Sequence, residues 1–275
     1  MKEMKRVYLL LISITISLSA LCQTSKHFTG TVKNANGQNI EYVTVVVKDM
    51  DIRTITDARG NFSVVVPDNN SPKLVFSHVA YSSKTVDIKG MSDKSHLDVV
   101  MEPSAYTLTD FTVVGKKIKE KTLKHKGLPF PGDVVFRGRN NIGVEMGITV
   151  KPKHDFHVKN IYLPVHKSTY SKCTLSVNVY EIFNKDSLVN ILHKPIYSVV
   201  EESQAKHTLE ITPQEPLVFT NHKGYYVSIE IVDTQSDGAI YLPAYLKTSY
   251  VRDPDSSKVK KIPINLGLSI KGFEY

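Results

Sequence analysis

The sequence contains no tryptophan and only two cysteines among its 275 residues. Cys22 ends a hydrophobic N-terminal segment, so removal of that segment leaves Cys173 as the single cysteine. One cysteine excludes an intramolecular disulfide, and the fold must therefore be stabilised by burial of apolar side chains. The lack of tryptophan also argues against a sugar-binding surface, because its indole is the largest flat ring on which a sugar could stack.

Long hydrophobic runs are confined to the N-terminus. A positively charged start precedes an apolar run at 7–21, which is the organisation of a signal peptide spanning residues 1–22. Cleavage after Cys22 is favoured over acylation of this cysteine, because the preceding Leu21 is bulky for a lipoprotein site. We therefore expect an exported protein in the periplasm, on the outer membrane surface or outside the cell, with no membrane span after cleavage.

The formal net charge is +8, but the positive residues are unevenly distributed. Part of the excess lies in the signal peptide, and much of the rest lies in the lysine-rich run within residues 116–127. We interpret 116–127 as a solvated basic linker between two domains. Such a run does not indicate nucleic-acid binding, although clustered lysines can attract an anionic lipid or polysaccharide surface.

Residues 28–115 are predicted to form short β-strands. Apolar residues alternate with polar ones with a period of two, as at Phe62, Val64 and Val66, and the strands are separated by turn dipeptides such as Asn36-Gly37 and Lys89-Gly90. No helical period is present. The pattern predicts a β-sandwich or barrel.

A resemblance to a known family rests on the order of several stretches of this region. They are Gly30-Thr31-Val32, Gly37, the run to Val47, Thr56-Asp57-Ala58-Arg59-Gly60-Asn61-Phe62, Phe76-Ser77-His78-Val79-Ala80-Tyr81, Val99-Val100-Met101-Glu102-Pro103 and the segment 108–115. Residues 28–115 resemble the carboxypeptidase-regulatory-like domain of exported Bacteroidetes proteins. The resemblance implies a seven-stranded, transthyretin-like (prealbumin-like) sandwich that is an accessory module without peptidase activity.

The first of these stretches has a structural explanation of its own. Asp57 is expected to accept backbone N–H bonds across a tight turn, and Gly60 to supply the positive φ that a Cβ would penalise. Phe62 then enters the core as the first inward residue of the returning strand. Thr56, Asp57, Gly60 and Phe62 are therefore predicted to form a hairpin and not a catalytic site.

Residues 128–275 are predicted to form a second antiparallel β-sandwich with a jelly-roll-like arrangement. Cys173, Leu175, Val177 and Val179 fall on one face of a strand, and the run from Tyr225 repeats this alternation. Further strands are expected at 144–150, 158–165, 207–211, 239–246 and 264–270.

We find no sequence pattern that supports catalysis, a metal site or a cofactor. His207 and Glu210 have the spacing of a metallocarboxypeptidase ligand pair, but strand positions three apart face opposite sides. Asp155 and His157 share a face and are interpreted as a solvated edge. Cys173 lies on an inward face and is interpreted as a core residue.

The favoured prediction is a non-enzymatic accessory protein of the cell envelope that contacts a protein or envelope partner through its sandwiches. A carbohydrate-binding module is the first alternative. For it, Tyr180 and Tyr226 are the candidate ligand-binding residues, because both oppose the inward faces of their strands. A hydrolase with a cryptic site is the second alternative, and it requires His and carboxylate side chains from separate strands to converge.

Overall fold

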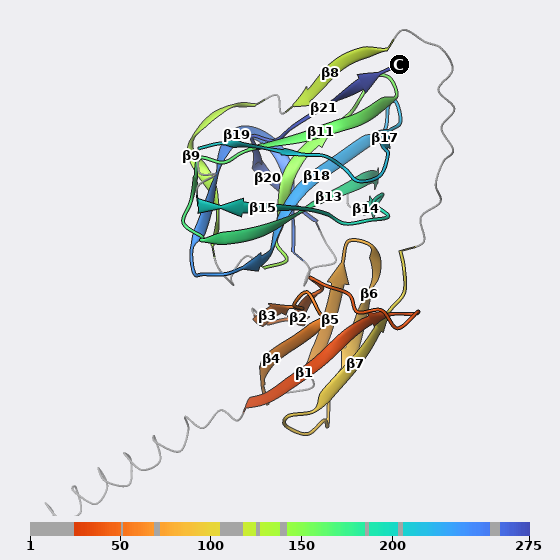
Figure 1. Ribbon diagram of the computed structural model, residues 1–275, viewed down its shortest axis with the longest axis vertical. Helices are drawn as coiled ribbons and strands as arrows, with labels where there is room; N and C mark the ends of the chain where they lie inside the picture. Colours follow the sequence, from red (N-terminus) through yellow and green to blue (C-terminus); the bar gives the residue numbers. More distant parts are fainter. Residues whose placement is uncertain are drawn as a thin grey trace, which may run out of the picture.

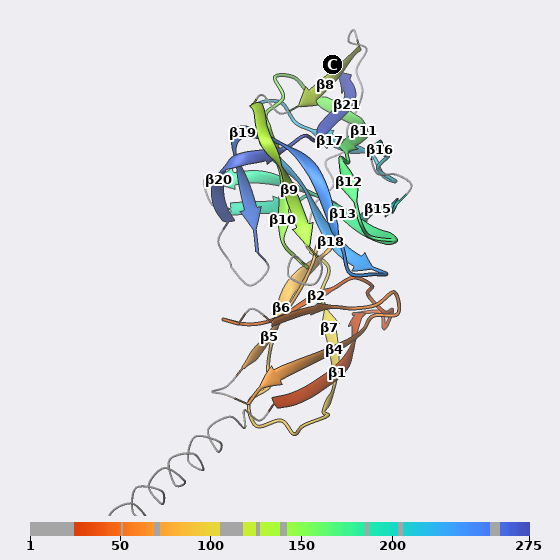
Figure 2. The same ribbon diagram turned by 90° about the vertical axis from the view of Figure 1, so that its left-hand side faces the viewer.

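The computed structural model describes residues 25–50, 52–68, 72–104, 118–124, 127–137, 142–184, 187–202, 206–253 and 259–275. The all-β prediction is confirmed, because strands and their connections account for these residues and they contain no α-helix. No helix that could cross a membrane is found in this part of the chain. Figures 1 and 2 show two β-structured units placed end to end. The predicted signal peptide, residues 1–22, lies outside the described residues.

The first unit consists of two sheets that pack face to face. One has the strand order β4-β1-β7, in which β1 pairs antiparallel with β4 and parallel with β7. The other has the order β3-β2-β5-β6. The strands are β1 (Ser25–Asn34), β2 (Thr44–Val47), β3 (Ile52–Ile55), β4 (Asn61–Pro67), β5 (Lys73–His78), β6 (Tyr81–Asp87) and β7 (His96–Met101).

The predicted hairpin motif lies between β3 and β4, which belong to different sheets, because β3 pairs with β2 and β4 pairs with β1. The motif is therefore a tight turn that leads from one sheet to the other, and the prediction of a hairpin is wrong. Asp57 Oδ1 accepts hydrogen bonds from the backbone N–H groups of Arg59 and Asn61, both at 2.8 Å, and these bonds lower the pKa of the carboxyl against the opposing effect of its partial burial. Gly60 has a φ of 74°, in the left-handed region that favours glycine. Phe62 is buried and packs edge-on against Phe76 at 5.3 Å between ring centroids. The turn at Asp57 and Gly60 thus fixes where β4 begins, so that Phe62 points into the core.

Strand β2 differs from the half-buried pattern. Its inward residues Val45 and Val47 are buried as expected, but Thr44 and Val46 on the opposite face are also buried. The Thr44 hydroxyl donates to Glu230 of the second unit at 3.1 Å. The outer face of this sheet is therefore covered at β2 by the second unit.

The second unit is built on a nine-stranded sheet, whose main path is β12-β19-β10-β18-β13-β14. Strand β15 pairs with β13, and both β9 and β20 pair with the long strand β19. The strands are β9 (Leu128–Arg137), β10 (Glu145–Val150), β12 (Lys167–Ser168), β13 (Lys172–Asn184), β14 (Ser187–Asn190), β15 (Ile196–Glu201), β18 (Gly224–Thr234), β19 (Ala239–Arg252) and β20 (Val259–Leu266).

A five-stranded sheet covers the inner face of the larger one. Its main path is β16-β11-β21-β8, with β17 paired to β11. Its strands are β8 (Lys119–Lys124), β11 (Phe156–Pro164), β16 (Thr208–Ile211), β17 (Leu217–Phe219) and β21 (Ser269–Glu274). The core between the two sheets contains the predicted inward face of β13, including Cys173 and Leu175, which are both fully buried.

The basic run is not a free linker over its whole length. Residues Lys119–Lys124 form β8, which pairs antiparallel with β21 at the edge of the five-stranded sheet. The lysine-rich composition is compatible with this position, because charged side chains protect an exposed sheet edge from pairing with other chains. The prediction of a linker across 116–127 is therefore wrong for 119–124, and residues 116, 117, 125 and 126 lie outside the described residues.

One predicted strand proves to be two. The segment 264–270 contains the end of β20 and the start of β21, which are separated at Gly267 and Leu268. The Gly267 N–H donates to the Pro243 carbonyl at 2.8 Å, outside the strand ladders. The apolar run continues through this corner because both strands face the same core, so hydrophobicity alone does not show the break.

Candidate functional site

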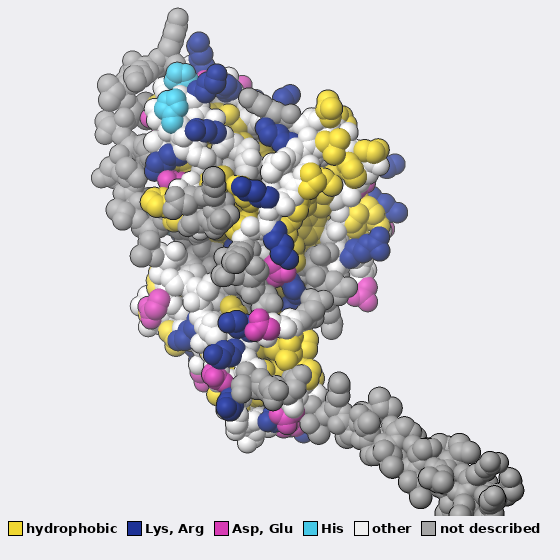
Figure 3. Space-filling model, turned by 180° about the vertical axis from the view of Figure 1, so that it is seen from behind, with side chains coloured by type: hydrophobic (Ala, Val, Ile, Leu, Met, Phe, Trp, Pro, Cys, Tyr) yellow, Lys and Arg dark blue, Asp and Glu magenta, His cyan; other side chains and the backbone are white. Residues whose placement is uncertain are grey.

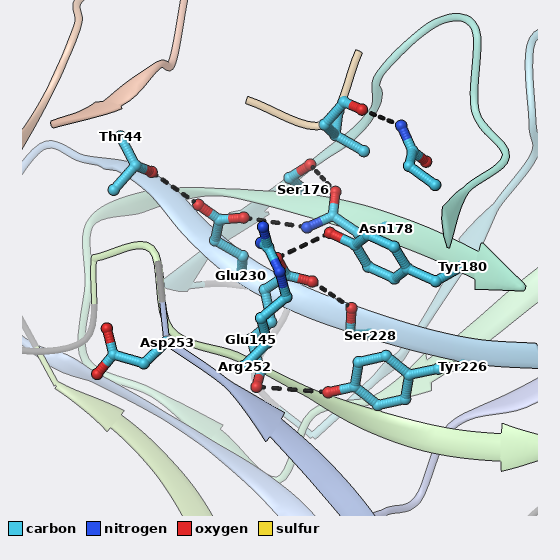
Figure 4. Close-up of polar contacts among 12 residues, drawn as sticks. Thr44, Glu145, Ser176, Asn178, Tyr180, Tyr226, Ser228, Glu230, Arg252 and Asp253 are labelled. Atoms are coloured by element: carbon cyan, nitrogen blue, oxygen red, sulfur yellow. Dashed lines mark hydrogen bonds and ion pairs between the residues drawn. The ribbon is translucent and has the colours of Figure 1, made fainter. Parts of the chain in front are cut away.

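A polar and charged cluster lies on the face of the nine-stranded sheet that points away from its core. We call it the interdomain cluster, and it consists of Thr44, Glu145, Asn178, Tyr180, Tyr226, Ser228, Glu230 and Arg252 (Figure 4). Strands β10, β13, β18 and β19 supply all of these residues except Thr44. The strand pairing aligns Tyr180 with Tyr226 and Glu145 with Arg252. Because side chains alternate along a strand, these positions share the outer face.

Glu145 is the most enclosed charged residue of the cluster, with a relative exposure of 1%. Its carboxylate forms an ion pair with Arg252 and accepts hydrogen bonds from the Tyr180 hydroxyl at 2.8 Å and the Ser228 hydroxyl at 2.7 Å. A buried carboxylate is tolerated when a charged partner and several donors replace its lost hydration. The surrounding residues supply both.

Glu230 connects the two units. Its carboxylate accepts from the Asn178 amide at 3.0 Å and from the Thr44 hydroxyl of the first unit at 3.1 Å. Burial, and then the negative charge of Glu145, raise the pKa of Glu230 to about 7. The carboxyl is therefore close to half-protonated at neutral pH.

Arg252 lies between the two carboxylates, and its guanidinium carbon is 5.6 Å from the centroid of the Tyr180 ring. The pKa of Arg252 is raised, first through Tyr180 and then through Glu145, so the guanidinium remains charged. With one cation against two carboxylates, the cluster is electrically neutral when Glu230 is protonated and carries a negative charge when it is not.

Further contacts join the two units around the cluster. Arg53 Nη1 lies 3.4 Å from Asp253 Oδ1 and donates to the Ile142 carbonyl at 3.3 Å. A second cation thus crosses the junction between the units.

Aromatic and amide groups complete the junction. His78 Nε2 is 3.3 Å from the Tyr197 hydroxyl, and the Tyr42 ring packs edge-on against Tyr197 at 5.1 Å. The Asn190 amide donates to the Val79 carbonyl. Burial lowers the pKa of His78 to about 4, so the imidazole is neutral here.

The cavity at this junction is small. It has about 20 Å³ of free space and is lined from both units, including His78, Tyr197, Glu230 and Arg252. A water molecule needs roughly 10–15 Å³ by this measure, so the space accommodates about one water and no sugar ring or peptide. The cluster is suited to fixing one unit against the other, and not to binding a substrate.

The expectation that Tyr180 and Tyr226 face solvent is wrong. Both oppose the core, as the alternation predicts, but their relative exposures are 4% and 0%. The Tyr226 hydroxyl donates to the Tyr250 carbonyl at 2.8 Å, and the Tyr250 ring packs edge-on against Tyr226. Strand β19 thus covers the face that the sequence pattern leaves open, and neither ring can stack on a ligand.

The structure places the other sequence candidates apart from this cluster. Burial raises the pKa of the Cys173 thiol to about 12, as suits a core residue and not a nucleophile. Asp155 Oδ1 accepts the Asn221 N–H at 2.7 Å, which fixes a loop. Within the described ranges, no group of three or more His, Cys, Asp or Glu side chains is arranged to hold a metal ion.

The sequence pattern does not reveal the charged residues of the cluster, because each lies on the polar side of a strand with ordinary alternation. Glu230 alternates with Ile229 and Ile231, and Glu145 precedes the apolar residues of β10. The polar side of a strand is normally solvated. One feature of the sequence does point to burial of this side. Ser228 and Glu230 lie on the same side of β18 as the bulky Tyr226, which is unusual for a face exposed to water.

The titration of Glu230 leads to a testable pH dependence. Its pKa is higher in the folded chain than in the unfolded one, so its contribution to stability is full below about pH 4.5 and is lost as the pH rises through about 7. Replacing Glu230 by glutamine should remove this loss. When the pH is raised from about 5 to about 8, the free energy of unfolding of the variant should increase by about 1–2 kcal/mol relative to that of wild type. The accessible surface of Glu230 limits the size of this difference.

Urea unfolding of both proteins at the two pH values measures this difference. His78 has the opposite effect, because its lowered pKa costs stability as the pH falls from 6.5 towards about 4. It is present in both proteins and cancels in the comparison. Identical pH slopes for the variant and wild type would show that Glu230 does not titrate in this range.

Comparisons with known proteins give one family match, confined to the N-terminal part of the chain, and structural likenesses that span most of it. No curated protein matches the chain. Among solved structures, the major pilin subunit BcpA*(D312A) of Bacillus cereus has 8% identity and a TM-score of 0.23, covering 88% of this chain and 69% of that one. A structure from work on carbohydrate-binding modules of the β-sandwich superfamily has 10% identity and a TM-score of 0.17, covering 87% and 98%. These TM-scores are low, and we base no inference on them.

A family model agrees with the fold of the first unit. The CarboxypepD_reg-like domain model matches residues 28–124, a range that begins within β1, includes β2–β7 and ends with the last residue of β8. By its hydrogen bonds, however, β8 is part of the second unit. Residues 28–124 are therefore similar to the CarboxypepD_reg-like domain.

Proposed function

We propose that this protein is an exported, non-enzymatic accessory protein of the cell envelope, in which two joined β-sandwiches contact a protein or envelope partner. In this proposal β1–β7 have the transthyretin-like arrangement and the second unit has a jelly-roll-like one. The CarboxypepD_reg-like domain supports an accessory role, and the predicted signal peptide at 1–22 supports export.

The observation that carries the proposal is the junction between the units. Thr44–Glu230, Arg53–Asp253 and His78–Tyr197 all cross it, and the cavity between them is about the size of a water molecule. A junction with buried, specific polar contacts resists reorientation more than a polar linker does. The chain is thus suited to present its surfaces in a fixed geometry.

Exposed hydrophobic side chains provide a surface for contact. Leu128 is 72% exposed and lies opposite Leu246, which is 48% exposed, across the β9–β19 pairing. Phe130, at 36%, lies on the same strand β9. Figure 3 shows a band of hydrophobic side chains across the second unit, with Lys and Arg side chains beside it. Contiguous exposed apolar surface on a soluble domain commonly marks an interaction site.

Site-specific photo-crosslinking in the native host tests this proposal. A photoreactive phenylalanine analogue at position 130 should give a discrete adduct in the envelope or extracellular fraction. The same analogue at Val65, which is exposed on β4 of the first unit, is the matched control. Recovery of the protein in the cytoplasm with its first 22 residues still attached, or no adduct at position 130, would overturn the proposal.

A further inference from the structure

A second, much larger concavity lies at the far end of the nine-stranded sheet, between β8, the residues that follow β10, and the strands β19 and β20. Its volume is about 860 Å³, within the range of roughly 300–1,000 Å³ that is usual for ligand sites. We call it the lysine groove. Its described lining includes six lysines and no Asp or Glu; the lysines are Lys121, Lys124, Lys151, Lys153, Lys247 and Lys261.

Most of these ammonium groups are not neutralised by carboxylates of the residues that the structure describes. Lys121 pairs with Glu274 at 2.7 Å, and Lys261 lies 5.9 Å from the centroid of the Tyr250 ring. The other four lysines make no ion pair with a carboxylate of the described residues. Like charges around a concave, low-dielectric wall focus a positive potential into it, so the groove attracts anions.

The rest of the lining is suited to a ligand that carries hydroxyl groups and apolar ring faces as well as charge. Thr122, Thr149 and Thr248 bring hydroxyls to the groove, and Leu123 and Val150 contribute apolar wall. Tyr250 is half-buried, and its ring is held edge-on by Tyr226 at 5.7 Å. A fixed aromatic ring beside hydroxyls and cations is a common surface for a sugar.

We propose that the lysine groove binds an acidic oligosaccharide. Its carboxylate or sulfate groups contact the free lysines, its hydroxyls exchange hydrogen bonds with the threonines, and a sugar ring lies along the Tyr250 side of the groove. This site is distinct from the buried Tyr180 and Tyr226, and it does not depend on the envelope partner, since binding is a property of the isolated chain.

Two other anionic ligands fit the groove less well. A lipid bilayer contacts flat or protruding basic surfaces, whereas Lys151, Lys153 and Lys247 surround a hollow. Single-stranded nucleic acid needs several aromatic platforms for successive bases, and Tyr250 is the one aromatic residue among the described lining.

Isothermal titration of purified residues 23–275 tests the assignment. Tetragalacturonate and a sulfated heparin tetrasaccharide are the anionic probes, and maltotetraose is the neutral probe of equal length. We expect binding of at least one anionic probe, weakened by salt, and none of maltotetraose. The triple variant Lys124→Gln, Lys151→Gln and Lys153→Gln should bind about tenfold more weakly or not at all.

A matched triple variant controls for net charge. Lys48→Gln, Lys73→Gln and Lys89→Gln removes the same number of charges from exposed positions of the first unit and should bind like wild type. No binding of either anionic probe, or equal losses in the two variants, would overturn the proposal. So would groove-dependent binding to phosphatidylglycerol vesicles or single-stranded DNA without oligosaccharide binding. Because these measurements involve no cellular partner, their failure leaves the crosslinking result unaffected.

Discussion

Replacing Arg252 by methionine is expected to lower the free energy of unfolding by about 3 kcal/mol. The guanidinium is the ion-pair partner of Glu145, whose relative exposure is 1%. Methionine is unbranched and keeps the apolar stem, but it is shorter and uncharged, so among the described side chains it leaves this carboxylate with the Tyr180 and Ser228 hydroxyls. Removing one partner of a buried pair is costly because the other charge stays desolvated. Urea unfolding followed by circular dichroism measures the loss.

A second substitution shows whether the unpaired charge is the cause. Glu145→Gln combined with Arg252→Met removes both charges and keeps an acceptor for a hydroxyl, so the double variant should be more stable than Arg252→Met alone. Lys223→Met removes an exposed cation that lies 3.0 Å from Glu181, and it should cost less than about 1 kcal/mol. If Arg252→Met costs no more than Lys223→Met, the cluster does not hold a buried charge pair.

Replacing Gly147 by alanine is expected to cost at least about 3 kcal/mol and to reduce the yield of folded protein. A Cβ at this position of β10 would lie 1.9 Å from the Val227 carbonyl oxygen and 2.5 Å from the Ser228 Cα. Both are backbone atoms of the paired strand β18, so the clash cannot be relieved by a rotamer change. The sheet must separate locally or shift in register.

Gly224→Ala is the matched control for Gly147. Gly224 begins β18, and an added Cβ would meet the Ile182 side chain at 3.4 Å, which is ordinary contact. We expect a change of less than about 1 kcal/mol in thermal or urea unfolding. Similar losses at both positions would mean that close approach of the strands at Gly147 is not the determining factor.

The positions of Arg252 and Gly147 are structurally related. The Ser249 hydroxyl of β19 donates to the Gly147 carbonyl at 2.6 Å, and the Glu145–Arg252 pairing is in the same pair of strands. Close contact of β10 with β18 and β19 thus brings Arg252 over the outer face of the sheet. The Gly147 variant should consequently also weaken the junction between the units, which limited proteolysis would detect as separation into two fragments.

Local sequence chemistry was sufficient to predict several features of the fold. The alternation in β4 and β13 places Phe62, Val64, Cys173 and Leu175 in their cores, as the structure shows. The turn at Asp57 and Gly60 follows from a side-chain acceptor and a glycine within four positions. These features depend on the period of the strand and on backbone sterics, which act between near neighbours in the chain.

The same alternation could not show what covers the second face of each sheet. Tyr180 and Tyr226 were correctly assigned to the face opposite the core, yet both are buried, and Tyr226 donates to the Tyr250 carbonyl of β19. On the same face, the first unit contacts Glu230 through Thr44. Likewise, the charge of Lys119–Lys124 indicated solvent contact but not pairing with β21. A period of two separates the two faces of a strand and carries no information about what packs against either of them.

The sequence alone was therefore enough for an all-β chain with two regions of strands and for the tight turn at Asp57 and Gly60, because these follow from side-chain alternation and turn sterics. That this turn joins two different sheets was decided by the tertiary structure. The interdomain cluster and the lysine groove required the tertiary structure. Both are assembled from strands that are distant in the chain, such as β2 with β18 and β8 with β19 and β20. Their charges act through distance and burial in space, and these quantities exist only after the sheets have packed.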